Sequence, residues 1–186
     1  FFTGLHAYLT AHSYANATLA DLLLELEKAS GRDLDAWSKV WLQEAGVTLL
    51  RPRIRLNEDG TIAELAVVQE AFSEGASLRP HRMGVAGYSL DGDTLVQDFR
   101  EELDVDGEHT PVPAAVGRRR SDMILLNDGD LAYAKVRMDE DSLAFATKSI
   151  DRIGDSLTRN IVLACAWDMT RDGEMAAHDY LRLAIT

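Results

Sequence analysis

Residues 49–70 read LLRPRIRLNEDGTIAELAVVQE, and this stretch decides the fold class of the chain. Two runs rich in branched apolar residues, LLRPRIRL and TIAELAVVQE, flank NEDG, a turn sequence whose glycine tolerates positive φ. The pattern predicts a β-hairpin.

The same alternation of apolar runs and turns continues to residue 138. RMGVAGYSL and TLVQDFREEL flank DGD, DVDGEH supplies another turn, and SDMILLN and LAYAKVRM flank a second DGD. In TPVPAAV, Pro111 and Pro113 require an edge strand or an irregular path, because proline cannot donate a ladder hydrogen bond. Seven or eight short strands joined by tight turns indicate an antiparallel β-sandwich over residues 49–138.

One of these strands changes its apolar phase. Met83 and Val85 are out of step with Tyr88 and Leu90, and Gly87 lies between the two pairs. A bulge or bend at Gly87 is the expected cause.

Helical patterns precede the sandwich, over residues 1–48. Thr18 is the expected N-cap of LADLLLELEKAS, answered three residues later by Asp21, and Gly31 is a left-handed stop. Asp33 is expected to cap the next helix, which carries Trp37 and Trp41 one turn apart and ends at Gly46. The two indoles are read as core residues, with a ligand shelf as the alternative.

Helical patterns also follow the sandwich, over residues 139–186. Asp139 caps EDSLAFATKSI, Asp155 or Ser156 caps LTRNIVLACAWDMTRD, and Gly173 ends the latter helix. A further helix then begins in EMAAHDYLRLAIT. The expected fold class is thus multidomain α and β: a helical segment, an antiparallel β-sandwich, and antiparallel helices resembling the start of an α-solenoid. Helical patterns that run to both ends suggest a fragment, which could self-associate through its apolar helix faces.

Composition limits the functions open to the chain. Its 186 residues are 46% hydrophobic and carry a formal net charge of −12, so nucleic acid and anionic membranes are disfavoured partners. Its single cysteine, Cys165, lies in an apolar run and is expected to be a buried, inert thiol. Lack of an internal disulfide fits a reducing, cytoplasmic compartment.

No catalytic, cofactor-binding or metal-binding residue is predicted in this chain. The spacing of the five histidines provides no pair four residues apart and no H-E-x-x-H, so His6 and His12, as well as His81, His109 and His178, are not expected to bind zinc. DVDGEH lacks the remaining ligands of a calcium loop and is read as a turn. Gly117–Arg120, GRRR, is read as a solvated turn paired with carboxylates, with anion binding as the alternative.

The opening helices resemble a known family. Residues 4–47 are similar to the closing helices of the catalytic domain in the aminopeptidase N family, the gluzincin zinc aminopeptidases. The shared positions are His12, Tyr14, Asn16, Ala17, Thr18, Asp21, Leu22, Ser30, Gly31, Asp33, Leu34, Trp37, Trp41 and Gly46. LLNDGDLAYAKVRMDEDSL resembles the family's sandwich-to-helix junction, and IGDSLTRNIVLACAWDMTRDGEMAAHDYL resembles the first C-terminal helices of its bacterial cytoplasmic branch.

The resemblance implies three domains and a role for each. Residues 1–48 would end a thermolysin-like catalytic domain, residues 49–138 would form the β-sandwich domain, and residues 139–186 would begin the helical C-terminal domain. The family's G-x-M-E-N loop, H-E-x-x-H and distal Glu are absent here, and neither Tyr8 nor Tyr14 is assigned the family's oxyanion role. The chain is therefore expected to be a non-catalytic scaffold fragment without a cofactor, whose parent holds zinc and removes N-terminal residues from peptides.

A second function class stays open beside this one. The chain would then be a stand-alone β-sandwich adaptor with helical flanks, which an exposed aromatic patch on the sandwich would favour. The sandwich aromatics Phe72, Tyr88, Phe99 and Tyr133 are read as core residues instead.

Overall fold

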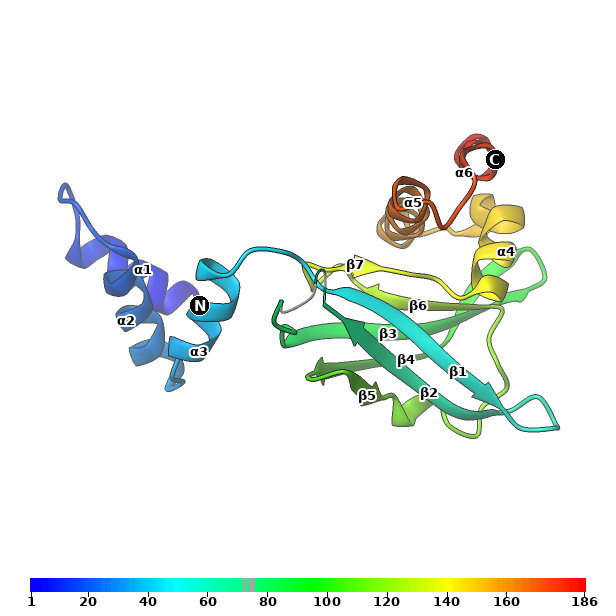
Figure 1. Ribbon diagram of the computed structural model, residues 1–186, viewed down its shortest axis with the longest axis horizontal. Helices are drawn as coiled ribbons and strands as arrows, with labels where there is room; N and C mark the ends of the chain where they lie inside the picture. Colours follow the sequence, from blue (N-terminus) through cyan, green and yellow to red (C-terminus); the bar gives the residue numbers. More distant parts are fainter. Residues whose placement is uncertain (72, 74–75) are drawn as a thin grey trace. The chain divides into compact units, whose positions relative to one another are not determined.

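A computed structural model describes residues 1–71, 73 and 76–186 of the chain (Figure 1). The chain divides into two compact units, Phe1–Ala45 and Gly46–Thr186. Phe72, expected above to be a core residue, lies outside the described residues.

The first unit is helical and begins as the sequence predicts. It contains α1 (Phe2–Ala11) and α2 (Leu19–Ser30). Thr18 and Asp21 form a reciprocal capping box at the start of α2, where the Thr18 hydroxyl accepts from the Asp21 amide at 3.3 Å and Asp21 accepts from the Thr18 amide at 2.8 Å. Gly31, with φ of 68°, ends the helix in the left-handed conformation. Both predicted ends of α2 are confirmed.

The remainder of the first unit departs from expectation. The helix after Asp33 is a single turn, α3 (Asp35–Ser38), followed by a π-helical segment, η1 (Lys39–Gln43), so it stops short of Gly46. The Trp37 side chain is 42% exposed and Trp41 is half-buried. The prediction that Trp37 belongs to a buried core is wrong within this unit, because its short helix has too few turns to present a full apolar face.

The second unit contains the predicted sandwich, built from seven strands in the described part of the chain. One sheet has the order β5-β2-β1-β7, and the other has the order β4-β3-β6. Tight turns at Gly60 and Gly92, both with positive φ, confirm the two long hairpins. The strands are β1 (Leu49–Leu56), β2 (Ile62–Glu70), β3 (His81–Asp91), β4 (Thr94–Val105), β5 (His109–Pro111), β6 (Met123–Asp128) and β7 (Lys135–Val136).

The third expected hairpin is wrong. β6 pairs with β3, whereas β7 crosses to the other sheet and pairs in parallel with β1, with Leu49 opposite Lys135 and Leu50 opposite Val136. Asn127 near the end of β6, and Gly129 and Asp130 in the turn after it, all have positive φ, and this turn redirects the chain from one sheet to the other. Two residues of strand are too few for their alternation to specify a partner.

The irregularity predicted at Gly87 is confirmed, but the extra residue lies on the partner strand. The register of β3 against β4 shifts between Gly87 and Tyr88, where Gly87 pairs with Phe99 and Tyr88 pairs with Gln97, so Asp98 of β4 is left unpaired. A Cβ atom at Gly87 would lie 2.3 Å from the Ser121 hydroxyl and 2.4 Å from the Phe99 ring. Glycine is therefore required here by the close approach of two neighbouring side chains.

The prolines behave as predicted. Pro111 ends β5, which is an edge strand, and Pro113 begins a short 3₁₀ turn, η2 (Pro113–Ala115). This segment contacts β2 and β4 and covers the open flank of the sandwich on that side.

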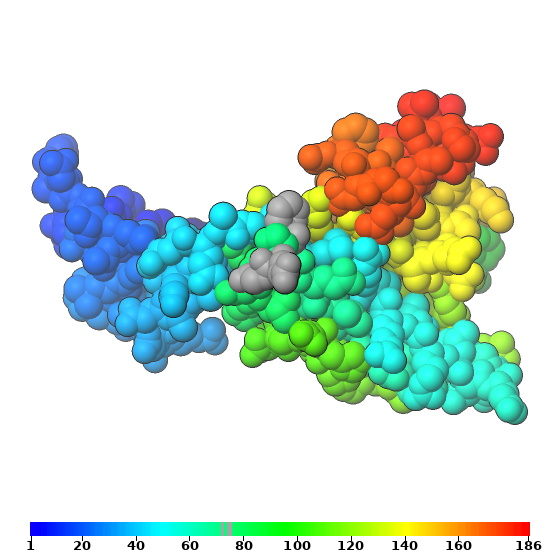
Figure 2. All heavy atoms as spheres, viewed as in Figure 1, coloured from blue at the N-terminus to red at the C-terminus, as the bar shows by residue number. Residues whose placement is uncertain are grey.

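Three α-helices cover the opposite flank, where β6 and β7 are the edge strands. They are α4 (Glu140–Ser149), α5 (Ser156–Arg171) and α6 (Ala177–Ile185), with a 3₁₀ turn, η3 (Ile150–Arg152), after α4. The Asp139 and Asp155 side chains accept from the amides of Ser142 and Thr158, which confirms both predicted N-caps. Figure 2 shows the orange and red atoms of α5 and α6 beside the yellow atoms that include α4, and α5 contacts β6 and β7.

One hydrophobic core runs through the sandwich and the helices. Leu50 and Leu126 of the strands belong to the same buried cluster as Val162 and Leu183 of the helices. The division of this unit into separate domains at 138/139 stays a prediction, and the packed core is continuous across that point.

The sandwich aromatics divide into two kinds. Phe99 is buried and Tyr88 is half-buried against the core, as predicted. Tyr133 is 73% exposed, so its expected place in the core is wrong. It lies in the segment between β6 and β7, which the sequence pattern had made a strand.

Candidate functional site

The histidines do not assemble a metal site in the described part of the chain. His81 and the Thr48 hydroxyl are 2.7 Å apart, His109 Nε2 lies 3.2 Å from Glu64, and His178 Nε2 lies 3.1 Å from Asp179. In the first unit, the His12 ring contacts the Tyr8 ring at a centroid distance of 5.4 Å, and His6 is exposed. Each of these side chains is placed by its own neighbours, and none belongs to a described group of three metal-ligating residues.

The pKa of His81 lies far below its ordinary value. Burial, together with the positive charge of Arg79, lowers its pKa from 6.5 to about 4. The ring is therefore neutral at pH 7 and suited to its short contact with Thr48 in the interior.

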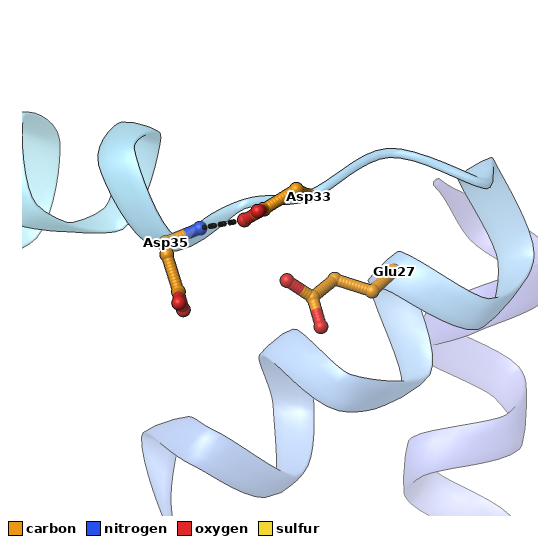
Figure 3. Close-up of side chains that lie close together, drawn as sticks. All are labelled: Glu27, Asp33 and Asp35. Atoms are coloured by element: carbon orange, nitrogen blue, oxygen red, sulfur yellow. Dashed lines mark hydrogen bonds between the residues drawn. The ribbon is translucent and has the colours of Figure 1, made fainter.

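Sequence analysis missed a trio of carboxylates in the first unit. Glu27, Asp33 and Asp35 each present an oxygen within 4.8 Å of the others (Figure 3). Two of them serve the start of α3, because the Leu34 amide donates to Glu27 at 2.8 Å and the Asp35 amide donates to Asp33 at 2.9 Å. The placement of Glu27 and Asp33 is thus explained by hydrogen bonds to the backbone, without a bound ligand. Of the three residues, only Asp33 was singled out in the sequence, where it was expected to cap a helix.

Cys165 is buried, as predicted. Burial is the main cause that raises the pKa of its thiol to about 12, and the negative charge of Asp168 adds to it. A thiol that stays protonated at pH 7 is neither a nucleophile nor a soft metal ligand.

Two of the three arginines of Gly117–Arg120, Arg118 and Arg120, are held by the protein itself. Arg120 pairs with Asp139 at the start of α4, as expected for a turn paired with carboxylates. Arg118 donates to the Ala114 carbonyl at 2.7 Å, and its guanidinium lies 5.9 Å from the centre of the Phe99 ring. DVDGEH is also a turn, with Gly107 at φ of 72°.

A cleft of about 240 Å³ lies between the second sheet and the start of α5. At its base Tyr88 donates to Asp128 at 2.6 Å, Gln97 donates to Tyr88 at 2.9 Å, and Arg100 donates to Asp128 at 2.7 Å. Burial, and then the Asp128 hydrogen bond, raise the pKa of Tyr88 to about 12. These groups satisfy one another, so the network stabilises this end of the second sheet.

A second hollow, of about 320 Å³, lies in the first unit. Trp37 lines it together with Phe1, Leu26 and Leu34, whereas Trp41 does not. The predicted alternative of a shelf formed by both tryptophans is therefore not what the structure presents. No described helix is long and apolar enough to cross a membrane.

Comparison with known proteins shows which class of protein has this fold. Residues 123–185 match the family model described as ERAP1-like C-terminal domain, and the match begins at the first residue of β6. The crystal structure of Legionella pneumophila aminopeptidase A in complex with aspartic acid superposes with a TM-score of 0.59 at 14% identity, covering 97% of this chain and 21% of that one. The fold is that of a segment of an aminopeptidase.

Sequence similarity is more specific. Aminopeptidase N of Streptomyces lividans is 50% identical over 193 residues, which cover 100% of this chain and 22% of the relative. Along its whole length the chain is thus similar to a segment of aminopeptidase N. It spans about a fifth of the length of this relative and of the matched crystal structure.

Proposed function

We propose that this chain is a non-catalytic framework segment of a zinc aminopeptidase whose whole polypeptide removes N-terminal residues from peptides. The observation that carries the proposal is the similarity to an aminopeptidase N, which is 50% identical along the entire chain. The aligned region covers 22% of the length of that relative. The segment would contribute helices next to the catalytic part, a sandwich, and helices that continue from it.

The side chains present do not fit a hydrolytic zinc ion. Such an ion takes nitrogen ligands from two histidines plus a carboxylate and keeps one position open for water. In the described residues the one gathered trio, Glu27, Asp33 and Asp35, is composed only of carboxylates, and His81, His109 and His178 contact separate partners. No catalytic step is assigned to this chain.

Zinc analysis and a peptidase assay test the proposal together. The purified 186-residue chain is dialysed against buffer with micromolar zinc, analysed for metal, and assayed with an aminoacyl amide. We expect substoichiometric zinc and no hydrolysis, while the full-length protein that contains this segment hydrolyses the same substrate. One zinc per chain together with amide hydrolysis by the isolated segment would refute the framework role.

The adaptor alternative has less support. The described aromatic residues of the predicted sandwich range are Tyr88, Phe99 and Tyr133. Among these, Tyr133 alone is exposed, so the three rings form no exposed aromatic cluster. We therefore retain the framework role as the single proposed function.

The cellular setting is part of the same proposal. We place the protein in the cytoplasm, where a lone buried thiol is stable, and we propose peptides, and neither nucleic acid nor membrane, as partners of the whole protein. Exposed apolar side chains of the first unit, including Phe2, Leu9 and Leu42, support self-association of the segment when it is isolated. Sedimentation velocity across a concentration series would show this as a rising mean mass.

A further inference from the structure

A cluster of charges joins the α5–α6 corner to the sandwich. The corner contains Asp172 and Glu174 on either side of Gly173, which has φ of 78°. Three cations of the sandwich sheet reach these two carboxylates: Arg51, Lys135 and Arg137. They lie on β1, on β7 and immediately after β7.

Glu174 binds two guanidinium groups at once. Arg51 donates to it through both terminal nitrogens, at 2.8 and 3.1 Å, and Arg137 donates to it at 2.9 Å. Asp172 likewise accepts from Lys135 at 2.8 and 2.7 Å and also pairs with Arg137. Arg137 is thus shared between the two carboxylates of the corner.

Strand pairing brings Arg51 and Arg137 side by side, so the carboxylates of Asp172 and Glu174 are needed to neutralise their charges. Leu50 lies opposite Val136 in the parallel pair, and Arg51 and Arg137 are the next residues on the two strands. The Arg137 amide donates to the Leu50 carbonyl at 2.8 Å, which holds the two chains together here. Two cations side by side repel each other, and the Arg137 side chain is only 2% exposed, so water does not screen it.

The corner itself is rigid. The amides of Glu174 and Met175 both donate to the Met169 carbonyl, at 2.8 and 3.2 Å, and the Gly173 amide donates to the Thr170 carbonyl at 3.2 Å. The two carboxylates are therefore presented by a fixed turn, and their position is tied to that of α5 and α6.

We infer that this corner and its three cations form an ionic clamp that locks α5 and α6 onto the sandwich, so that the junction at 138/139 is not a hinge. The family model that spans residues 123–185 includes both sides of the clamp except Arg51, which agrees with strand and helix being one structural element. The inference goes beyond the proposed function, because it holds whether or not the whole protein hydrolyses peptides.

Hydrogen exchange of the 186-residue chain, followed by mass spectrometry, tests the clamp. Glu174→Gln keeps the shape of the side chain and removes the charge that separates Arg51 from Arg137. We expect amides of residues 156–185 to exchange at least about tenfold faster, since charged hydrogen bonds are lost, while those of β3 and β4 change less than about twofold.

Glu70→Gln is the matched control. Glu70 also accepts from Arg51, at 3.0 Å, but it lies on β2 within the sheet and does not hold the corner. We expect it to leave exchange in residues 156–185 unchanged. Should Glu174→Gln fail to fold, Arg51→Gln removes one arm of the clamp and should accelerate the same residues about threefold.

Two results would overturn the inference. In the first, Glu174→Gln accelerates amide exchange in residues 156–185 no more than Glu70→Gln does. The same holds for Arg51→Gln if it takes the place of Glu174→Gln. This result would mean that apolar packing alone holds the helices. The other is an equal acceleration across the whole second unit, which would mean that the cluster contributes to global stability without locking the corner.

Discussion

Tyr88 donates a 2.6 Å hydrogen bond to Asp128 across the second sheet, although 40 residues separate the two in the chain. Asp128 ends β6 and is also held by Arg100, so three strands meet at one buried carboxylate. The bond fixes the end of β6 at the point where the chain turns toward the other sheet.

Tyr88→Phe tests this bond. Removing the hydroxyl takes one donor from a buried carboxylate, so we expect the free energy of unfolding to fall by about 1–2 kcal/mol, measured by urea denaturation. Tyr133→Phe is the control, because that ring is exposed, and it should change stability by less than about 0.5 kcal/mol. Equal effects of the two variants would contradict the role given to Tyr88.

Gly87→Ala tests the bulge. The added methyl would lie 2.3 Å from the Ser121 hydroxyl, and the core must shift to accept it. We expect a loss of about 1–3 kcal/mol in the free energy of unfolding, or failure to fold. Gly154→Ala is the matched control, since its added methyl meets nothing within 4 Å and should be neutral or slightly stabilising. A neutral Gly87→Ala would show that Ser121 and Phe99 do not approach β3 this closely.

His81 predicts a pH dependence of stability. Its folded pKa of about 4 is below the unfolded value of 6.5, so between these values the unfolded chain binds more protons. Stability from the neutral ring is therefore complete above pH 6.5 and is lost as the pH falls through 4, by about 3 kcal/mol in total. Chemical denaturation from pH 4 to 7 should show a flatter profile for His81→Gln than for the unsubstituted chain.

Cys165 predicts slow thiol chemistry. The side chain is 5% exposed and its pKa is raised to about 12, so little thiolate is present or accessible at pH 8. We expect iodoacetamide to modify the folded chain at least about a hundredfold more slowly than the chain in denaturant. Equal rates in both states would place the thiol at the surface.

The sequence predicted the features that depend on neighbours along the chain. Thr18 and Asp21 are three residues apart, and the phase change around Gly87 lies within one strand, so each left a readable local pattern. The turns at Gly60 and Gly92 likewise follow from the backbone freedom of glycine.

Features that depend on distant partners were not predictable from the same patterns. The parallel pairing of β7 involves only Lys135 and Val136, and the contact of Arg51 with Glu174 spans 123 residues. Such contacts are specified by tertiary packing, which a periodicity does not encode. Trp37 was misplaced for a similar reason, because burial depends on what packs against a helix and not on its spacing alone.

The core shared by the sandwich and the helices restricts how genes of this family can recombine. A crossover at codon 138 would join the strands of one parent to the helices of another, and the cluster that contains Leu126, Val162 and Leu183 would then combine side chains from two parents. Inheritance of residues 46–186 as a single block avoids that mismatch, so chimeric genes should tolerate exchange near codon 45 far better than exchange near codon 138.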